Sequence, residues 1–143
     1  MTASDPPRAR ATRVERAGAL RDDPRATRGR RAEQVVADYL VARGFSILAT
    51  NLRVGRLEID LVAQRGDLAV MVEVRTRGRT AFEGALASIA GKKRARIIAA
   101  AERLWSERLA AAPGIDRMRI DVAAVSFDGG IASVEYIEGA ITA

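Results

Sequence analysis

The sequence contains no cysteine and no histidine. Without cysteine it can form neither disulfide bonds nor thiolate metal sites. Without histidine it cannot build an imidazole zinc site, a catalytic triad or a histidine general base. Carboxylates, lysine, arginine and tyrosine must therefore carry any chemistry. A metal site made only of carboxylates favours Mg²⁺ or Mn²⁺ over zinc.

Long apolar runs are also missing from the chain. No stretch approaches the ~18 consecutive apolar residues that a membrane-spanning helix requires. The N-terminus lacks the apolar segment that is typical of a signal peptide. We therefore expect a cytoplasmic protein that has no membrane partner.

Lysine is scarce, because Lys92 and Lys93 are the only two, and arginine supplies almost all of the positive charge. The net charge is +6 and the isoelectric point is about 10.9. A basic balance of this kind suits a partner with a phosphate backbone. A high-GC genome, which encodes arginine wherever a surface cation is acceptable, would produce the same excess. Composition alone leaves both explanations open.

The length of 143 residues, with 48% hydrophobic and 29% charged residues, is typical of one globular domain with a proper core. Residues 1–27 are rich in Arg, Ala, Pro and Asp, and Pro6, Pro7 and Pro24 interrupt any long helix. We interpret residues 1–27 as a disordered basic N-terminal arm and residues 28–143 as the single domain.

Hydrophobic periodicity within residues 28–143 predicts two helices and five strands. The predicted helices cover 28–43 and 91–111, and the predicted strands cover 45–53, 57–63, 68–75, 119–127 and 131–137. Gly44 and the pair Pro113-Gly114 end the two helices. This order predicts an α/β domain with a central mixed β-sheet flanked by helices.

The stretch Leu57–Arg77 reads as a β-hairpin with acids on one of its faces. In an antiparallel pair only residues of the same face oppose each other. A two-residue loop at Arg65-Gly66 would set Asp60 opposite Met71, whereas a loop at Gly66-Asp67 would set it opposite Glu73.

Both registers place the same four charged side chains on one surface, and only a β-bulge would break this arrangement. These residues are Glu58, Asp60, Glu73 and Arg75. Carboxylates this close repel each other, so such a cluster usually exists to hold a divalent cation.

Other charged residues have two interpretations each. Glu33 could reach the acid cluster, but spacing alone favours a solvated glutamate that the helix dipole stabilises. Four cations open the second predicted helix, where they would either bind phosphate or form a plain solvated turn. These cations are Lys92, Lys93, Arg94 and Arg96.

We interpret Asp121 as a structural partner of a nearby arginine, and Trp105 as a core residue rather than a base-stacking platform.

The chain resembles the YraN-like family of small bacterial proteins, which share the restriction-endonuclease-like fold of Holliday-junction resolvases. The resemblance runs from Gly29 to about Val125. Its segments are Ala32-Glu33, Tyr39-Leu40, Gly44-Phe45, Asn51, Glu58–Ala63, Val72–Arg77, Lys93, Arg119 and Asp121-Val122. Each segment alone is weak, but their order and spacing together are specific.

The resemblance implies a nuclease site of the PD-(D/E)xK type that uses Mg²⁺ or Mn²⁺. Asp60 and Glu73 would bind the metal, Glu33 would complete the site and Glu58 would support it. The basic helix start, together with Arg77 or Arg79, would hold flanking phosphates of the nucleic acid. Resolvase-like relatives work as symmetric pairs, which leaves a homodimer open.

Two positions depart from the family pattern. Leu57 replaces the usual glycine, which should alter packing only. Arg75 stands where the motif has a catalytic lysine. Arginine can neutralise charge, but it cannot give up its proton, since its pKa exceeds ~12.

Three functions from different classes remain after this reading. The first is a metal-dependent nuclease or nuclease-like protein that acts on structured or branched DNA. The second is a non-catalytic nucleic-acid-binding protein whose acids serve the fold. The third is a structural protein that uses the nuclease fold as a scaffold for a dimer. The fold alone does not decide among them.

Overall fold

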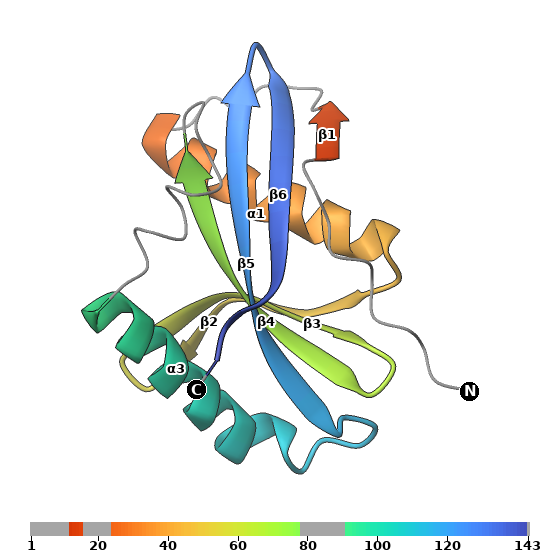
Figure 1. The fold of residues 1–143 in the computed structure, drawn as a ribbon, viewed down its shortest axis with the longest axis vertical. Helices are drawn as coiled ribbons and strands as arrows, with labels where there is room; N and C mark the ends of the chain where they lie inside the picture. The colour runs from red at the N-terminus through yellow and green to blue at the C-terminus, as the bar shows by residue number, and fades with distance from the viewer. Residues whose placement is uncertain (1–11, 16–23, 78–90, 143) are drawn as a thin grey trace.

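The computed structural model describes residues 12–15, 24–77 and 91–142. They form one mixed β-sheet with α1 packed on one face and α3 on the other (Figure 1). The helices are α1 (Pro24–Ala42) and α3 (Lys92–Leu104), and α3 continues into a π-helical turn, Trp105–Leu109. The strands are β1 (Thr12–Glu15), β2 (Ser46–Val54), β3 (Leu57–Arg65), β4 (Leu68–Arg77), β5 (Arg117–Asp128) and β6 (Ile131–Ile141).

The strands lie in the order β1-β6-β5-β4-β3-β2. Strands β4 and β5 are parallel, and α3 lies between them in the sequence, whereas all other neighbours are antiparallel. This confirms the prediction of a mixed sheet flanked by helices. No helix within the described ranges is long and apolar enough to cross a membrane.

The N-terminal region differs in part from the predicted disordered arm. Thr12–Glu15 form strand β1 along the edge strand β6, and α1 begins at Pro24. The free hydrogen-bonding edge of β6 gives this short segment a partner that the sequence pattern did not reveal. Residues 1–11 and 16–23 lie outside the described residues, and the division of the chain at residue 28 stays a prediction.

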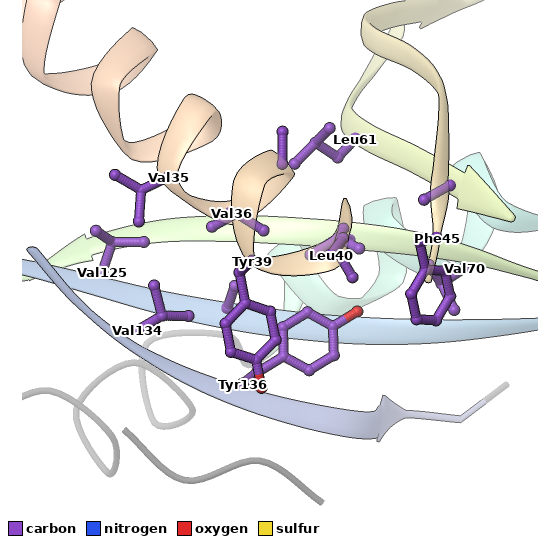
Figure 2. Close-up of a cluster of buried hydrophobic side chains, with 14 of the residues drawn as sticks. Val35, Val36, Tyr39, Leu40, Phe45, Leu61, Val70, Val125, Val134 and Tyr136 are labelled. Carbon is purple, nitrogen blue, oxygen red and sulfur yellow. The ribbon is translucent and has the colours of Figure 1, made fainter. Parts of the chain in front are cut away.

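The core on the α1 face is built from the apolar stripe that the sequence predicted for the first helix (Figure 2). The buried stripe consists of Ala32, Val35, Val36, Tyr39 and Leu40. The rings of Tyr39 and Tyr136 stack with their centroids 5.1 Å apart, which ties α1 to β6. The helix therefore has a fixed position over the sheet.

Along β3 and β4, side chains alternate between the two cores as the period-2 pattern predicted. Leu61 and Val72 belong to the α1 core, and Val62 and Met71 belong to the α3 core. Ile59 departs from strict alternation, because it packs in the α3 core whereas Leu61, two residues later, packs in the α1 core. The part of β3 that precedes Leu61 is not paired with β4, and together with β2 it twists away from the rest of the sheet (Figure 1). This twist changes the direction of the Ile59 side chain.

Asp121 is completely buried, and its carboxylate is surrounded by hydrogen-bond donors. The Arg119 guanidinium donates two bonds of 2.8 and 3.0 Å, the Tyr136 hydroxyl donates a third, and the Gly139 N–H donates a fourth of 2.8 Å. Burial, and then the Asp121 charge, raise the pKa of Tyr136 well above its usual value. The prediction of a structural pairing with arginine is confirmed.

Candidate functional site

The predicted hairpin adopts the register with its loop at Gly66-Asp67. Its last pair is Leu61 with Val72, so the next residues, Asp60 and Glu73, lie where the two strands part. The Asp60 carboxylate accepts a 2.8 Å hydrogen bond from the Val74 backbone N–H. At the point where β3 leaves β4, the Asp60 carboxylate thus takes the place of a backbone acceptor for the Val74 N–H. This hydrogen bond fixes the direction of the carboxylate.

Asp60 is held in an environment that opposes its ionisation. Burial, and then the Glu73 charge, raise the pKa of Asp60 from 3.8 to about 7. The Val74 hydrogen bond and Lys93 act in the opposite direction, and Glu33 adds to the rise. Near neutral pH the folded protein therefore keeps a desolvated acid beside a second carboxylate.

Glu73 is 8% exposed and contacts two cations. The Nζ atom of Lys93 lies 3.3 Å from its Oε2 atom, and the Nη1 atom of Arg75 lies 3.6 Å from the same oxygen. Lys93 comes from the first turn of α3, whereas Arg75 comes from β4 itself. The negative charge of Glu73 is thus balanced by cations from two different elements.

Glu33 reaches the site from α1. Its Oε1 atom accepts a 3.0 Å hydrogen bond from the Asn51 Nδ2 atom. Pairing of Thr50 with Leu61 and of Leu52 with Ile59 places Asn51 opposite Asp60. Partial burial, and then the Glu58 charge, raise the pKa of Glu33, while the Asn51 bond lowers it. Glu33 thus bonds to Asn51 opposite the hairpin acids, and its role in the acid cluster stays a prediction.

A pocket of about 260 Å³ opens on the α3 side of the parted strands. Its charged lining residues are Arg56, Glu58, Asp60, Glu73, Lys93 and Arg96. The hairpin thus brings its three predicted acids into one cavity, and α3 brings two of its four predicted cations there.

Two other predicted binding residues that the structure describes, Lys92 and Arg94, do not line the pocket. Lys92 is exposed, and the Arg94 Nη2 atom donates a 3.3 Å hydrogen bond to the Thr142 carbonyl oxygen. The side chain of Arg77 and the whole of Arg79 lie outside the described residues. Trp105 is partly exposed and packs against the α3 core, as expected of a core residue rather than a stacking platform.

Asp60 and Glu73 provide the oxygen donors that suit a hard divalent cation. Among the residues that the structure describes, no three acidic side chains lie close enough together to hold a metal ion as they stand. Mg²⁺ is commonly bound through one or two protein carboxylates, with water and substrate phosphates completing its shell. A carboxylate pair therefore fits Mg²⁺ or Mn²⁺, and Glu33 and Glu58 would act from the surroundings of the pair.

Sequence reasoning missed two residues of the site. Arg56 belongs to the turn before β3 and lines the pocket. Asn51 is the one non-glycine residue with positive φ, 50°, in the described part of the chain. An asparagine inside a strand pattern was the available signal, since asparagine tolerates this conformation. Lys93, which was predicted to bind phosphate, also contacts the acid Glu73, and its phosphate-binding role stays a prediction.

We expect Asn51→Ala to destabilise the protein by roughly 1–2 kcal/mol, because alanine resists positive φ and cannot bond to Glu33. Asn51→Gly is the matched control, since glycine accepts the backbone conformation and removes only the side chain. Urea unfolding should show the alanine variant to be the less stable of the two. Equal stability of both variants would contradict a conformational role for this residue.

These features define a mixed α/β protein with a carboxylate pocket at the parting of two central strands. The chain belongs to the uncharacterised protein family UPF0102, whose model matches residues 32–125. This confirms the YraN-like resemblance that the motifs carried.

Relatives support this assignment over most of the chain. A UPF0102 protein of Sorangium cellulosum is 47% identical over 130 residues, which is 90% of each chain. One of Azorhizobium caulinodans is 43% identical over 113 residues, covering 79% of this chain and 81% of the relative. Their descriptions give the family and no activity.

Among solved structures, this chain is similar to SfsA of Pyrococcus furiosus in complex with Ca²⁺. The alignment covers 92% of this chain and 77% of the other, at 11% identity and a TM-score of 0.39. A likeness of this degree carries no argument about fold family or function.

Proposed function

We propose that this protein is a metal-dependent nuclease of the restriction-endonuclease-like, PD-(D/E)xK type, acting on structured or branched DNA. The observation that carries the proposal is the presence of Asp60 and Glu73 in one pocket, just beyond the last pair of β3 and β4. A structural role alone gives no reason to keep a desolvated acid beside a second acid, because the arrangement costs stability. The expectation of a DNA partner rests on the family resemblance and on the net charge of +6.

Each charged residue of the pocket has a role in this reaction. Asp60 and Glu73 would hold Mg²⁺ or Mn²⁺, which polarises the scissile phosphate and lowers the pKa of the attacking water. Val74 orients Asp60 through its backbone N–H, and Asn51 orients Glu33 in the same way through its side chain. Arg56 and Arg96 border the pocket, where they would hold flanking phosphates.

The test is cleavage of a labelled four-way DNA junction and a linear duplex of matched sequence, each with Mn²⁺, Mg²⁺ or EDTA. We expect the wild type to cut in a metal-dependent manner and Asp60→Ala to lose cutting, because half of the carboxylate pair is gone. The exposed Asp116, changed to alanine, is the matched control and should cut like the wild type. Preference for the junction over the duplex tests the expected substrate class separately.

Arg75→Lys extends the same experiment. We expect this variant to cut as well as or better than the wild type, since it restores the motif lysine beside Glu73. Metal-independent cutting, or cutting that survives Asp60→Ala, would contradict the proposed site. A homodimer, which the resemblance leaves open, can be examined on the same samples by light scattering.

A second candidate function is non-catalytic binding of nucleic acid. Arg75 favours it, because an arginine at the motif position cannot deprotonate water. Binding without cutting in every variant, Arg75→Lys included, would support this candidate. Each phosphate contact should then contribute about −0.9 to the slope of log K against log salt concentration. A flat salt response would contradict both nucleic-acid functions and leave the scaffold interpretation.

A further inference from the structure

Lys93 is the pocket cation that forms an ion pair with Glu73. Its Nζ atom is 3.3 Å from the Glu73 Oε2 atom, and its side chain lines the cavity together with Asp60. The side chain is 37% exposed, so its ammonium group is open to a molecule that enters the pocket. Lys93 therefore lines the same cavity as both members of the carboxylate pair.

Arg75 occupies the motif position in the sequence but has a different place in the structure. Its Nη1 atom contacts the Glu73 Oε2 atom at 3.6 Å, and its side chain is 23% exposed. Within the described part of the chain, Arg75 is not among the residues that line the pocket. Arg75 thus contacts Glu73 without lining the pocket.

We infer that Lys93 on α3, rather than Arg75 on β4, is the catalytic cation that contacts the scissile phosphate. This inference rests on the proposed function. In phosphodiester hydrolysis, the oxygen of water bonds to phosphorus while the bond from phosphorus to one sugar oxygen breaks. The water gives up one proton to solvent, and the leaving oxygen takes one from solvent. Negative charge grows on the non-bridging oxygens, and a lysine in the pocket donates hydrogen bonds to them.

The first part of the test compares Lys93→Met with Arg75→Met, since methionine keeps an apolar stem and removes the charge. Arg108→Met, an exposed position in the π-helical turn, controls for the loss of one positive charge. Single-turnover cleavage with Mn²⁺ should fall by about 10²-fold or more in Lys93→Met and by about tenfold at most in Arg75→Met. Lys93→Arg should recover part of the rate. DNA affinity in EDTA should fall by similar factors in both methionine variants, because each loses one cation.

The second part of the test measures Mn²⁺ binding by calorimetry without DNA. Lys93 is a positive charge beside the acids and competes with the ion, so Lys93→Met should bind Mn²⁺ about three- to tenfold more tightly. Arg75→Met should change the affinity less, because Arg75 does not line the pocket that holds both acids. Tighter metal binding together with slower cleavage is a combination that partial unfolding of the variant cannot produce.

The outcomes separate this inference from the proposed function. A wild type that cleaves while Lys93→Met cleaves equally well would overturn the inference alone. A larger loss in Arg75→Met than in Lys93→Met, or weaker Mn²⁺ binding in Lys93→Met, would do the same. A wild type that cleaves neither DNA substrate would overturn the proposed function, and the inference with it.

Discussion

Replacing Asp60 with asparagine is expected to stabilise the metal-free protein while abolishing the proposed metal binding. Asparagine can still accept the hydrogen bond from the Val74 N–H, which measures 2.8 Å. It removes a desolvated negative charge that lies beside Glu73. We expect a gain of roughly 1–3 kcal/mol in the free energy of unfolding at pH 8. A residue whose removal stabilises the fold is one that the fold does not require.

The expected gain depends on pH in a defined direction. Because the pKa of Asp60 is raised from 3.8 to about 7, the folded protein binds this proton more tightly than the unfolded chain does. The contribution of the protonated acid is therefore complete below about pH 4, and it is lost as pH rises toward 7. The asparagine variant lacks this titration, so its advantage should be small near pH 4 and largest at pH 8.

Urea unfolding in EDTA at pH 5 and pH 8 would measure the effect. Asp116→Asn, at an exposed position, is the matched control and should match the wild type at both pH values. If the asparagine variant of Asp60 is less stable than the wild type at pH 8, the claim that ionised Asp60 destabilises the fold is contradicted. Calorimetric titration with Mn²⁺ on the same samples should show binding to the wild type and none to the Asp60 variant.

Replacing Asp121 with alanine is expected to have the opposite effect on stability. Its carboxylate is completely buried and accepts hydrogen bonds from Arg119, Tyr136 and Gly139. Its removal takes away the acceptor of the buried Tyr136 hydroxyl group and the main ion-pair partner of Arg119. Breaking a buried pair in this way costs about 3–5 kcal/mol, which corresponds to roughly 10 °C or more in the melting temperature.

An exposed pair of the same chemistry provides the control. Asp67 and Arg117 form an ion pair of 3.1 Å in which both side chains are 49% exposed. Because solvent screens this pair, Asp67→Ala should cost less than about 1 kcal/mol. Thermal unfolding of the two alanine variants side by side would measure the difference. Equal losses would show that burial does not strengthen the role of Asp121.

These two predictions show that two aspartates in strands of the same sheet can have opposite effects on stability. Each interrupts an apolar strand, and the sequence alone suggested a metal ligand for Asp60 and a structural acceptor for Asp121. The structural role is confirmed by four donors around one carboxylate. The metal role of Asp60 stays a prediction, supported by its place beside Glu73.

Local pattern was enough to predict the helices, the hairpin and the face of the sheet that bears the acids. A strand has period 2 and a helix has period 3.6, so the sequence itself determines which side chains share a face. For this reason Glu58, Asp60 and Glu73 could be placed together before the register was known, since both registers preserve the face.

Only the tertiary structure decided which groups from distant segments meet those acids. The pairing of β1 with β6 depends on contacts between residues far apart in the chain. The same holds for the Asn51–Glu33 bond and for the approach of Lys93 to Glu73. No local spacing encodes such contacts, because they follow from how helices dock on a twisted sheet. The sequence therefore determined where the acids lie, and the packing of α1 and α3 decided which partners surround them.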